Sequence, residues 1–206
     1  MDIFFILALV FTSIVAVTFI VERGLALRWK KVIPPDLQAI VQGYSSGKDL
    51  SRLQDACRQN PSALSRLLMF ASEHVDWTRA ENSELLETRA RQEVSKLERG
   101  LVILEIIVGI APLLGLVGTI YGLITLFSGM GQGGDNTKFA QGISLALNAT
   151  LIGLLVAIPA LVAWSYYNKK VETLSLEMES LCEEFLRKHY GAEETYEEEV
   201  IPRKKR

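Results

Sequence analysis

The sequence has little of the chemistry on which enzymes and metalloproteins depend. Its 206 residues include two cysteines and two histidines. The histidines, His74 and His189, are isolated and expected to be exposed, and no Cys/His cluster has metal-ligand spacing. Neither the phosphate-binding pattern GxxxxGKS/T nor the nucleophile motif GxSxG occurs. The sequence therefore predicts a protein that is not an enzyme and that holds no metal and no cofactor.

An excess of charge of one sign is also absent. The 22 Lys and Arg residues nearly balance the 24 Asp and Glu residues, which leaves a formal net charge of −2. This balance favours neither nucleic acid nor an acidic substrate as a partner. The charges are segregated, however, and residues 3–21 carry none. A helix that spans a bilayer needs about 20 apolar residues, so the sequence predicts three spans, at residues 3–21, about 101–127 and about 140–167.

The first apolar segment lacks the marks of a cleaved signal peptide. Asp2 precedes it in place of a Lys or Arg, and no small-x-small cleavage site stands before Glu22. A basic cluster follows the segment and consists of Arg23, Arg28, Lys30 and Lys31. These features predict a retained anchor whose N-terminus lies outside the membrane.

Lysine and arginine positions predict the orientation of the other spans. The basic residues that flank them are Arg89, Arg91, Lys96 and Arg99 before the second span, and Lys169 and Lys170 after the third. The loop between these two spans holds only Lys138. Because cytoplasmic loops carry the excess of Lys and Arg, that loop is expected outside and the C-terminal tail in the cytoplasm. Cys57 and Cys182 then both lie on the cytoplasmic side, where a disulfide is not expected.

The predicted fold is an all-α membrane protein in which two long spans extend into a cytoplasmic helical bundle. Its predicted segments are 1–22 (first transmembrane helix), 23–100 (cytoplasmic helical region), 101–128 (second transmembrane helix), 129–138 (external loop), 139–168 (third transmembrane helix), 169–190 (cytoplasmic helix) and 191–206 (disordered charged tail).

Helix boundaries outside the membrane follow from glycine, proline and capping residues. Residues 36–58 read as short helices broken by Gly43 and Gly47, and Asn60-Pro61-Ser62 is a helix-start signal. Between that signal and Gly100 there is no Gly, which predicts one long helix continuing into the second span. After the third span, apolar residues recur at helical spacing and predict packing within a bundle: Val171, Leu174, Met178, Leu181 and Phe185. Gly191 is expected to end that helix.

Small residues and one threonine share a helical face in each of the last two spans. Gly115, Thr119 and Gly122 lie on such a face of the second span, and Ala146, Thr150 and Gly153 on that of the third. In a membrane such a face serves either close helix packing or the lining of a polar path. A single threonine usually bonds its own helix carbonyl, but two on small-residue faces near mid-membrane favour an ion pathway.

Three further polar residues within the predicted spans are candidate functional residues. Ser144 and Asn148 are one turn apart on the opposite face of the third span, and we interpret them as interhelical hydrogen-bonding residues. Glu105 lies about one turn inside the second span on the cytoplasmic side. Snorkelling to the interface and pairing with a basic residue are both preferred over a proton-relay role for it.

Three stretches, LERGL (97–101), APLLGLVGTIYGLI (111–124) and GISLALNATLIGLLVAIPA (142–160), resemble the MotA/TolQ/ExbB family of ion-channel subunits. The three-span layout resembles its ExbB/TolQ branch more closely than the four-span MotA proteins. The resemblance implies a bacterial inner-membrane protein that forms a homopentameric ring around a single-span partner of the ExbD/TolR type. That partner would bring a membrane Asp, and proton flow would drive a TonB-like or TolA-like effector.

The resemblance also implies roles for particular residues. Thr119 and Thr150 match threonines that line the family's pore. ExbB and TolQ usually carry a Glu where this chain has Leu145, so the partner's Asp would be the only carboxylate in the path. A sodium-driven motor and a structural scaffold without conduction stay open as alternatives, because hydroxyl oxygens also suit Na⁺ and small faces also serve packing alone.

Overall fold

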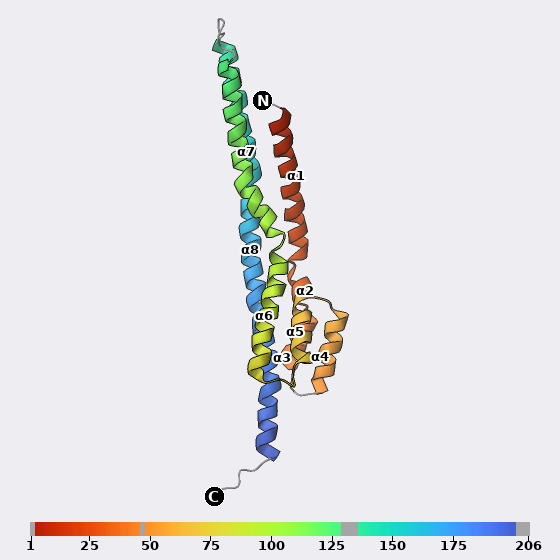
Figure 1. The fold of residues 1–206 in the computed structure, drawn as a ribbon. Helices are drawn as coiled ribbons and strands as arrows, with labels where there is room; N and C mark the ends of the chain where they lie inside the picture. The colour runs from red at the N-terminus through yellow and green to blue at the C-terminus, as the bar shows by residue number, and fades with distance from the viewer. Residues whose placement is uncertain (1–2, 46–47, 129–135, 201–206) are drawn as a thin grey trace. The chain divides into compact units, whose positions relative to one another are not determined.

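The computed structural model describes residues 3–45, 48–128 and 136–200, and these residues form eight α-helices. They cluster into two compact units. Unit 1 contains Met1–Leu25 and Glu98–Lys169, and unit 2 contains Ala26–Leu97 and Lys170–Arg206. The predicted all-α class is confirmed for the described residues (Figure 1). Gly47 and most of the predicted external loop, residues 129–135, lie outside them.

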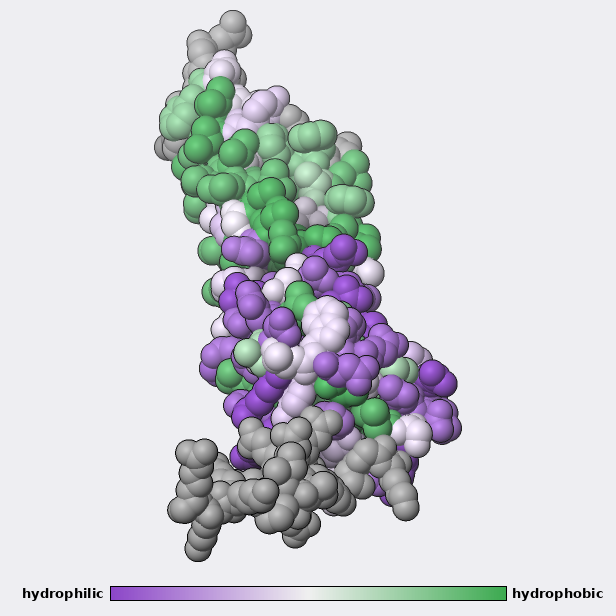
Figure 2. All heavy atoms as spheres, turned by 60° about the horizontal axis from the view of Figure 1, so that its bottom comes forward, coloured by the Kyte–Doolittle hydropathy of each residue, from purple (hydrophilic) through white to green (hydrophobic). Residues whose placement is uncertain are grey.

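Unit 1 is built from three apolar helices, α1 (Ile3–Ala26), α7 (Leu101–Ser128) and the first part of α8 (Asn136–Val200). Three helices of the described chain are long and apolar enough to cross a membrane, and they are these three. This result confirms the three predicted spans and identifies an integral membrane protein. The visible surface of this unit is mainly hydrophobic (Figure 2), as a lipid-facing or subunit-facing surface must be.

The three helices of unit 1 meet through small side chains. A buried cluster joins one residue of α1, two of α7 and two of α8: Ala16, Ile107, Ala111, Ala157 and Ala160. The Tyr167 hydroxyl on α8 also donates a hydrogen bond of 2.8 Å to the Ile20 carbonyl on α1. Because alanine and glycine let helix backbones approach closely, dispersion contacts are dense where lipid gives no hydrophobic driving force.

Unit 2 is a bundle of helices with a surface that is mainly hydrophilic (Figure 2). Its helices are α2 (Trp29–Val32), α3 (Pro35–Gly43), α4 (Lys48–Gln59), α5 (Ala63–Glu73), α6 (Arg79–Glu98) and the second part of α8. Leu37, Leu53, Leu64 and Phe185 are fully buried in its core. The predicted apolar face of α8 is buried from Val171 to Phe185, which confirms packing within one bundle.

Two predicted helix boundaries in unit 2 are confirmed. Helix α3 ends at Gly43, and α5 begins after Ser62. The Ser62 hydroxyl accepts a hydrogen bond of 3.0 Å from the Ser65 backbone N–H, and the Ser65 hydroxyl accepts one of 2.7 Å from the Ser62 N–H. This reciprocal cap satisfies two backbone donors that a helix start would otherwise leave unpaired.

The prediction of one helix running from residue 61 into the second span is wrong. The chain leaves the helix between α5 and α6, where Glu81 accepts hydrogen bonds from the Thr78 N–H and hydroxyl at 3.2 and 2.7 Å. This T-x-x-E capping box starts α6. A second break separates α6 from α7 at Arg99 and Gly100. The Arg23 side chain lies against Gly100 and would have to move to make room for a Cβ there.

Two further predictions fail at the end of α8. Gly191 does not end the helix, which continues to Val200, because one glycine costs only about 1 kcal/mol and the alanine and glutamates that follow are good helix formers. His189 is 8% exposed and not exposed as predicted. Its Nδ1 lies 2.8 Å from the Tyr44 hydroxyl, so α8 uses it to contact the residue that follows α3. His74 is half-buried.

Both cysteines are free, as predicted, and both are buried. Burial raises the pKa of the Cys57 thiol to about 11. Burial, with smaller effects from Cys57 and Glu179, raises the pKa of the Cys182 thiol to about 12. Both thiols therefore stay protonated at physiological pH and react slowly, because the thiolate is the nucleophile.

Helices α5 and α6 are joined by a carboxylate that has no exposed surface. Glu93 on α6 is 0% exposed. It accepts hydrogen bonds from Arg66 Nε at 2.8 Å and from Lys96 Nζ at 2.6 Å. Burial disfavours the charged carboxylate, but the hydrogen bonds and charges of Arg66 and Lys96 outweigh it and hold the pKa of Glu93 below its usual value.

Acid should weaken unit 2 through Glu93. A glutamate in the unfolded chain has a pKa of about 4.3. The stabilisation by Glu93 is therefore complete above that pH and is lost as the pH falls through the lower pKa of the folded chain. We expect Glu93→Gln to cost about 2 kcal/mol at pH 7 and to flatten the loss of stability below about pH 4.5. Thermal unfolding in detergent between pH 7 and pH 3 measures both effects. Glu87→Gln, which removes an exposed pair with Arg91, is the control and should cost under about 0.5 kcal/mol.

Candidate ion-pathway site

Helices α7 and α8 pack with their small faces against each other. A Cβ placed on Gly115 would lie 2.8 Å from the Ala149 carbonyl oxygen, and one placed on Gly153 would lie 2.6 Å from the Ala111 carbonyl oxygen. Real Cβ atoms do not approach backbone oxygens so closely, so both positions require glycine at this helix separation. Gly122 and Ala146 continue the contact, because a Cβ on Gly122 would lie 3.0 Å from that of Ala146.

This close approach brings the two candidate threonine hydroxyls together. Thr119 Oγ1 on α7 and Thr150 Oγ1 on α8 are 2.5 Å apart, and either can be the donor. The Thr119 hydroxyl is also 3.0 Å from the Ala146 carbonyl and 3.1 Å from the Gly115 carbonyl. The Thr150 hydroxyl is 3.2 Å from the Gly115 carbonyl. Thr119 is 7% exposed and Thr150 is partly buried.

The hydroxyl pair has more acceptors than protons. Each hydroxyl carries one proton, so when Thr119 donates to Thr150, the Thr150 proton points to the Gly115 carbonyl. In the reverse arrangement Thr150 donates to Thr119, whose proton points to the Ala146 or the Gly115 carbonyl. Rotation about two C–O bonds exchanges these arrangements without moving a heavy atom. Each hydroxyl can therefore be either the donor or the acceptor of the hydrogen bond between the two threonines, which lie between apolar helices.

The structure places the other predicted site residues away from this contact. Ser144 and Asn148 are exposed on α8, and Glu105 is exposed on α7. Leu145, at the position of the family's usual Glu, is 54% exposed. These side chains lie on surfaces that this chain offers to lipid or to another subunit. Their interhelical role therefore stays a prediction that needs a second chain.

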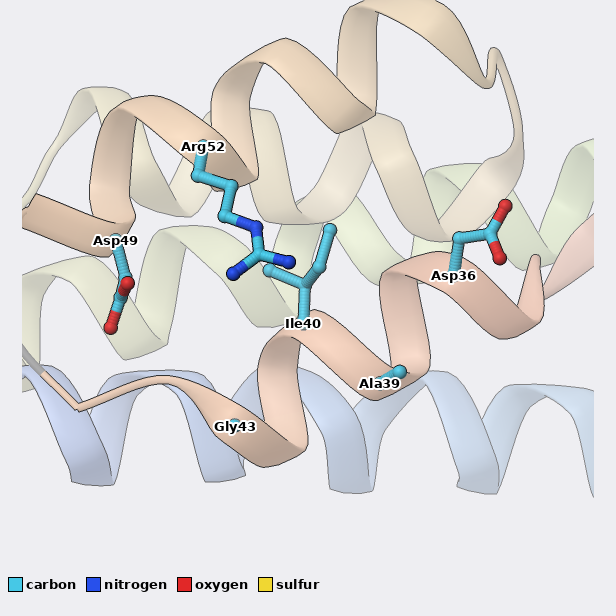
Figure 3. A pocket seen from close by; sticks show the side chains of 6 residues that line it. All are labelled: Asp36, Ala39, Ile40, Gly43, Asp49 and Arg52. Carbon is cyan, nitrogen blue, oxygen red and sulfur yellow. The ribbon is translucent and has the colours of Figure 1, made fainter.

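A hollow of about 280 Å³ lies between α3 and α4 in unit 2 (Figure 3). The Arg52 side chain of α4 points toward Ile40 of α3, and Asp36 and Asp49 stand at its two ends. Its described lining residues are Asp36, Ala39, Ile40, Gly43, Asp49 and Arg52. Its charged lining side chains are two carboxylates and one guanidinium.

Comparison with known proteins identifies the family. The profile described as the MotA/TolQ/ExbB proton channel family matches residues 57–180. The chain belongs to this family. The match includes α7 and the part of α8 that carries the threonine pair and the glycine contact. The family resemblance drawn from the sequence is therefore confirmed.

Individual relatives support the ExbB/TolQ branch. The chain is 31% identical over 195 residues to the Tol-Pal system protein TolQ of Pseudomonas aeruginosa, which covers 87% of this chain and 83% of that protein. It is 31% identical over 140 residues to a putative biopolymer transport protein ExbB homolog of Methanothermobacter thermautotrophicus, covering 68% of this chain and 50% of the relative. It is 43% identical over 81 residues to biopolymer transport protein ExbB of Helicobacter pylori, covering 38% and 56%. The chain thus spans only about half the length of these two ExbB relatives.

Both threonines can be found in the sequence, but the hydrogen bond between them cannot. Each helical face could be drawn separately from the 3.6-residue period. Pairing the two faces antiparallel, so that Gly115 meets Gly153, would have placed Thr119 beside Thr150. The missing step was the register between α7 and α8, which the close glycine contact defines.

Proposed function

We propose that this chain is the ion-conducting subunit of an inner-membrane motor complex of the ExbB/TolQ type. Five copies would form a ring around the span of an ExbD/TolR-like partner that carries a membrane Asp. Proton flow through the complex would drive a TonB-like or TolA-like effector. Family membership and three apolar helices support this proposal, and the threonine pair is the observation that carries the mechanism.

The threonine pair would help a proton pass an apolar section of the path. Among the described residues, the groups that hydrogen-bond at this contact of α7 with α8 are hydroxyls and backbone carbonyls, and neither kind of group titrates near pH 7. The pair can therefore orient water or the partner's carboxylic acid but cannot store a proton itself. A titratable group must come from the partner, since Leu145 stands where a glutamate would otherwise be.

Proton flux into vesicles tests this division of roles. We expect the chain alone to conduct poorly and the chain with its single-span partner to conduct roughly tenfold faster or more, because a proton in hydrocarbon needs titratable groups or water. Changing the partner's membrane Asp to Asn should remove the gain. Leu145→Glu should change coupling little, because a carboxyl among apolar helices has a raised pKa and stays largely neutral. Robust flux through the chain alone would show that the essential carboxylate lies within this chain.

The same vesicles separate the two alternative functions. A sodium-driven motor would conduct only with a Na⁺ gradient at equal pH on both sides, since hydroxyl and carbonyl oxygens suit that hard cation. A structural scaffold is favoured by one observation, which is that both threonine hydroxyls already have hydrogen-bond partners inside the chain. A scaffold would show no flux of either ion with any partner.

We further propose an N-terminus outside the cytoplasm and unit 2 inside it, as the distribution of Lys and Arg predicts. Cysteines introduced by Asp135→Cys and Leu50→Cys should then be labelled from opposite sides of sealed vesicles by an impermeant thiol reagent. The native Cys57 and Cys182 are buried, with raised pKa values, so they should give a low background. Labelling of both introduced cysteines from one side would contradict this topology.

A further inference from the structure

Three cations of unit 2 have no acidic partner within the described chain. Arg28, Lys30 and Lys31 are exposed, and no ion pair joins any of them to a described residue. Trp29, in the same short stretch, is 39% exposed. Some other cations do pair with acids: Arg23 pairs with Glu22, Arg66 and Lys96 with Glu93, and Lys188 with Glu184. A run of unpaired cations around an exposed tryptophan calls for an external anion.

The segment is held rigidly by its apolar neighbours. Leu27 and Ile33 are 0% exposed and Val32 is 3% exposed, and these residues lie on both sides of the cations. The Ile33 N–H donates a 2.8 Å hydrogen bond to the Trp29 carbonyl, and the Lys31 N–H donates one of 2.9 Å to the Arg28 carbonyl. The cationic side chains are therefore presented outward from a fixed backbone and not from a loose linker.

Chain connectivity places this segment at a membrane surface. Helix α1, which is apolar enough to span a bilayer, ends at Ala26. Arg28 follows two residues later, a separation of at most about 7 Å along the chain. Glu22 is the last acid before the segment and already pairs with Arg23, and the next acid along the chain is Asp36. Lipid phosphates are the anions available at the end of a helix that spans a bilayer.

We propose that Arg28, Lys30 and Lys31 bind the phosphate groups of anionic phospholipids, with Trp29 seated among the headgroups. Arg and Lys donate several hydrogen bonds to phosphate oxygens. Each basic residue near an anionic membrane surface raises the affinity for that surface about fivefold. Tryptophan prefers the interface because its ring is apolar and its indole N–H needs a polar partner. These residues recognise the net negative charge of the lipid, so they bind anionic phospholipid in preference to zwitterionic phospholipid.

Tryptophan quenching by brominated lipids tests this proposal on the full chain in vesicles. Trp77→Phe and Trp164→Phe leave Trp29 as the sole tryptophan. Brominated phosphatidylglycerol, diluted into phosphatidylcholine, should quench Trp29 with an apparent affinity at least about fivefold above that of brominated phosphatidylcholine. The combined variant Arg28→Gln, Lys30→Gln and Lys31→Gln should bring the two lipids to parity. Lys30→Arg with Lys31→Arg should keep the preference.

A matched control removes three other charges from unit 2. Arg52, Arg79 and Arg187 are exposed and have no ion-pair partner among the described residues, and their replacement by Gln should leave the lipid preference unchanged. If both brominated lipids quench Trp29 equally while Arg28, Lys30 and Lys31 are unchanged, or if neither lipid quenches it, the proposal is overturned. Loss of the preference on adding millimolar inorganic phosphate would also overturn it, because it would identify a small-anion site and not a lipid surface. Circular dichroism of each variant verifies folding.

Discussion

Replacing both Thr119 and Thr150 by valine should lower proton flux through the complex about tenfold or more, with assembly intact. Valine has nearly the shape of threonine but lacks the hydroxyl, so the path loses a donor and acceptor that bridges α7 and α8 at 2.5 Å. Loss of one hydrogen bond along the pathway raises the free-energy barrier to proton transfer by about 1.4 kcal/mol, which slows the rate about tenfold. The measurement is flux into vesicles that hold the chain with its single-span partner.

The control for this variant is Thr125→Val in the same helix. The Thr125 hydroxyl bonds only its own helix, donating to the Tyr121 carbonyl at 3.0 Å, so its loss should leave flux unchanged. Mass in mild detergent should be the same for all variants, because the Gly115 and Ala146 carbonyls remain helix acceptors after the change. Undiminished flux in the double valine variant would remove the pair from the pathway and favour the scaffold function.

Gly115→Ala and Gly153→Ala should each destabilise unit 1 by about 1–3 kcal/mol. The new methyl carbons would lie 2.8 Å from the Ala149 oxygen and 2.6 Å from the Ala111 oxygen. These are backbone atoms, which cannot rotate away as the end of a long side chain can, so α7 and α8 must separate. Separation also lengthens the bond between the threonines, and flux should fall together with stability. Thermal unfolding in detergent measures the first effect and vesicle flux the second.

Gly109→Ala is the matched control in α7, because no heavy atom lies within 4 Å of a Cβ placed there. An alanine in a helix interior is favoured over glycine by about 0.5–1 kcal/mol, so this variant should be neutral or slightly more stable. The double variant Gly115→Ala with Gly153→Ala should deviate from additivity, since a Cβ on Gly153 would lie 3.1 Å from the Gly115 Cα. Unaltered melting of both single variants would mean that the helices are farther apart than described.

Helices were predicted correctly where the sequence has a strong 3.6-residue period or an apolar run long enough to span a membrane. The three spans follow from long, strongly apolar runs, because a bilayer-spanning helix needs about 20 predominantly apolar residues. The buried face of α8 from Val171 to Phe185 follows from 3.6-residue spacing. The start of α5 follows from Ser62, whose cap is local in the chain. Each of these features depends on residues within a few positions of one another.

The predictions that were wrong concern features that depend on residues far apart in the chain. His189 is buried because α8 brings it to Tyr44, 145 positions away, and no local pattern marks that contact. The break at Gly100 coincides with the Arg23 side chain, which arrives from α1. The break before α6 was an exception, since Thr78 and Glu81 form a capping box that could have been found in the sequence.

The sequence alone determined that this protein is helical, that it crosses a membrane through three apolar segments, and that each of the last two carries a threonine among small residues. Periodicity and hydrophobic length are properties of single helices, and one chain of letters contains them. Only the tertiary structure decided that Gly115 lies against Gly153 and that the Thr119 and Thr150 hydroxyls are 2.5 Å apart. The register between two helices depends on how closely their backbones approach, and that is decided by both surfaces together.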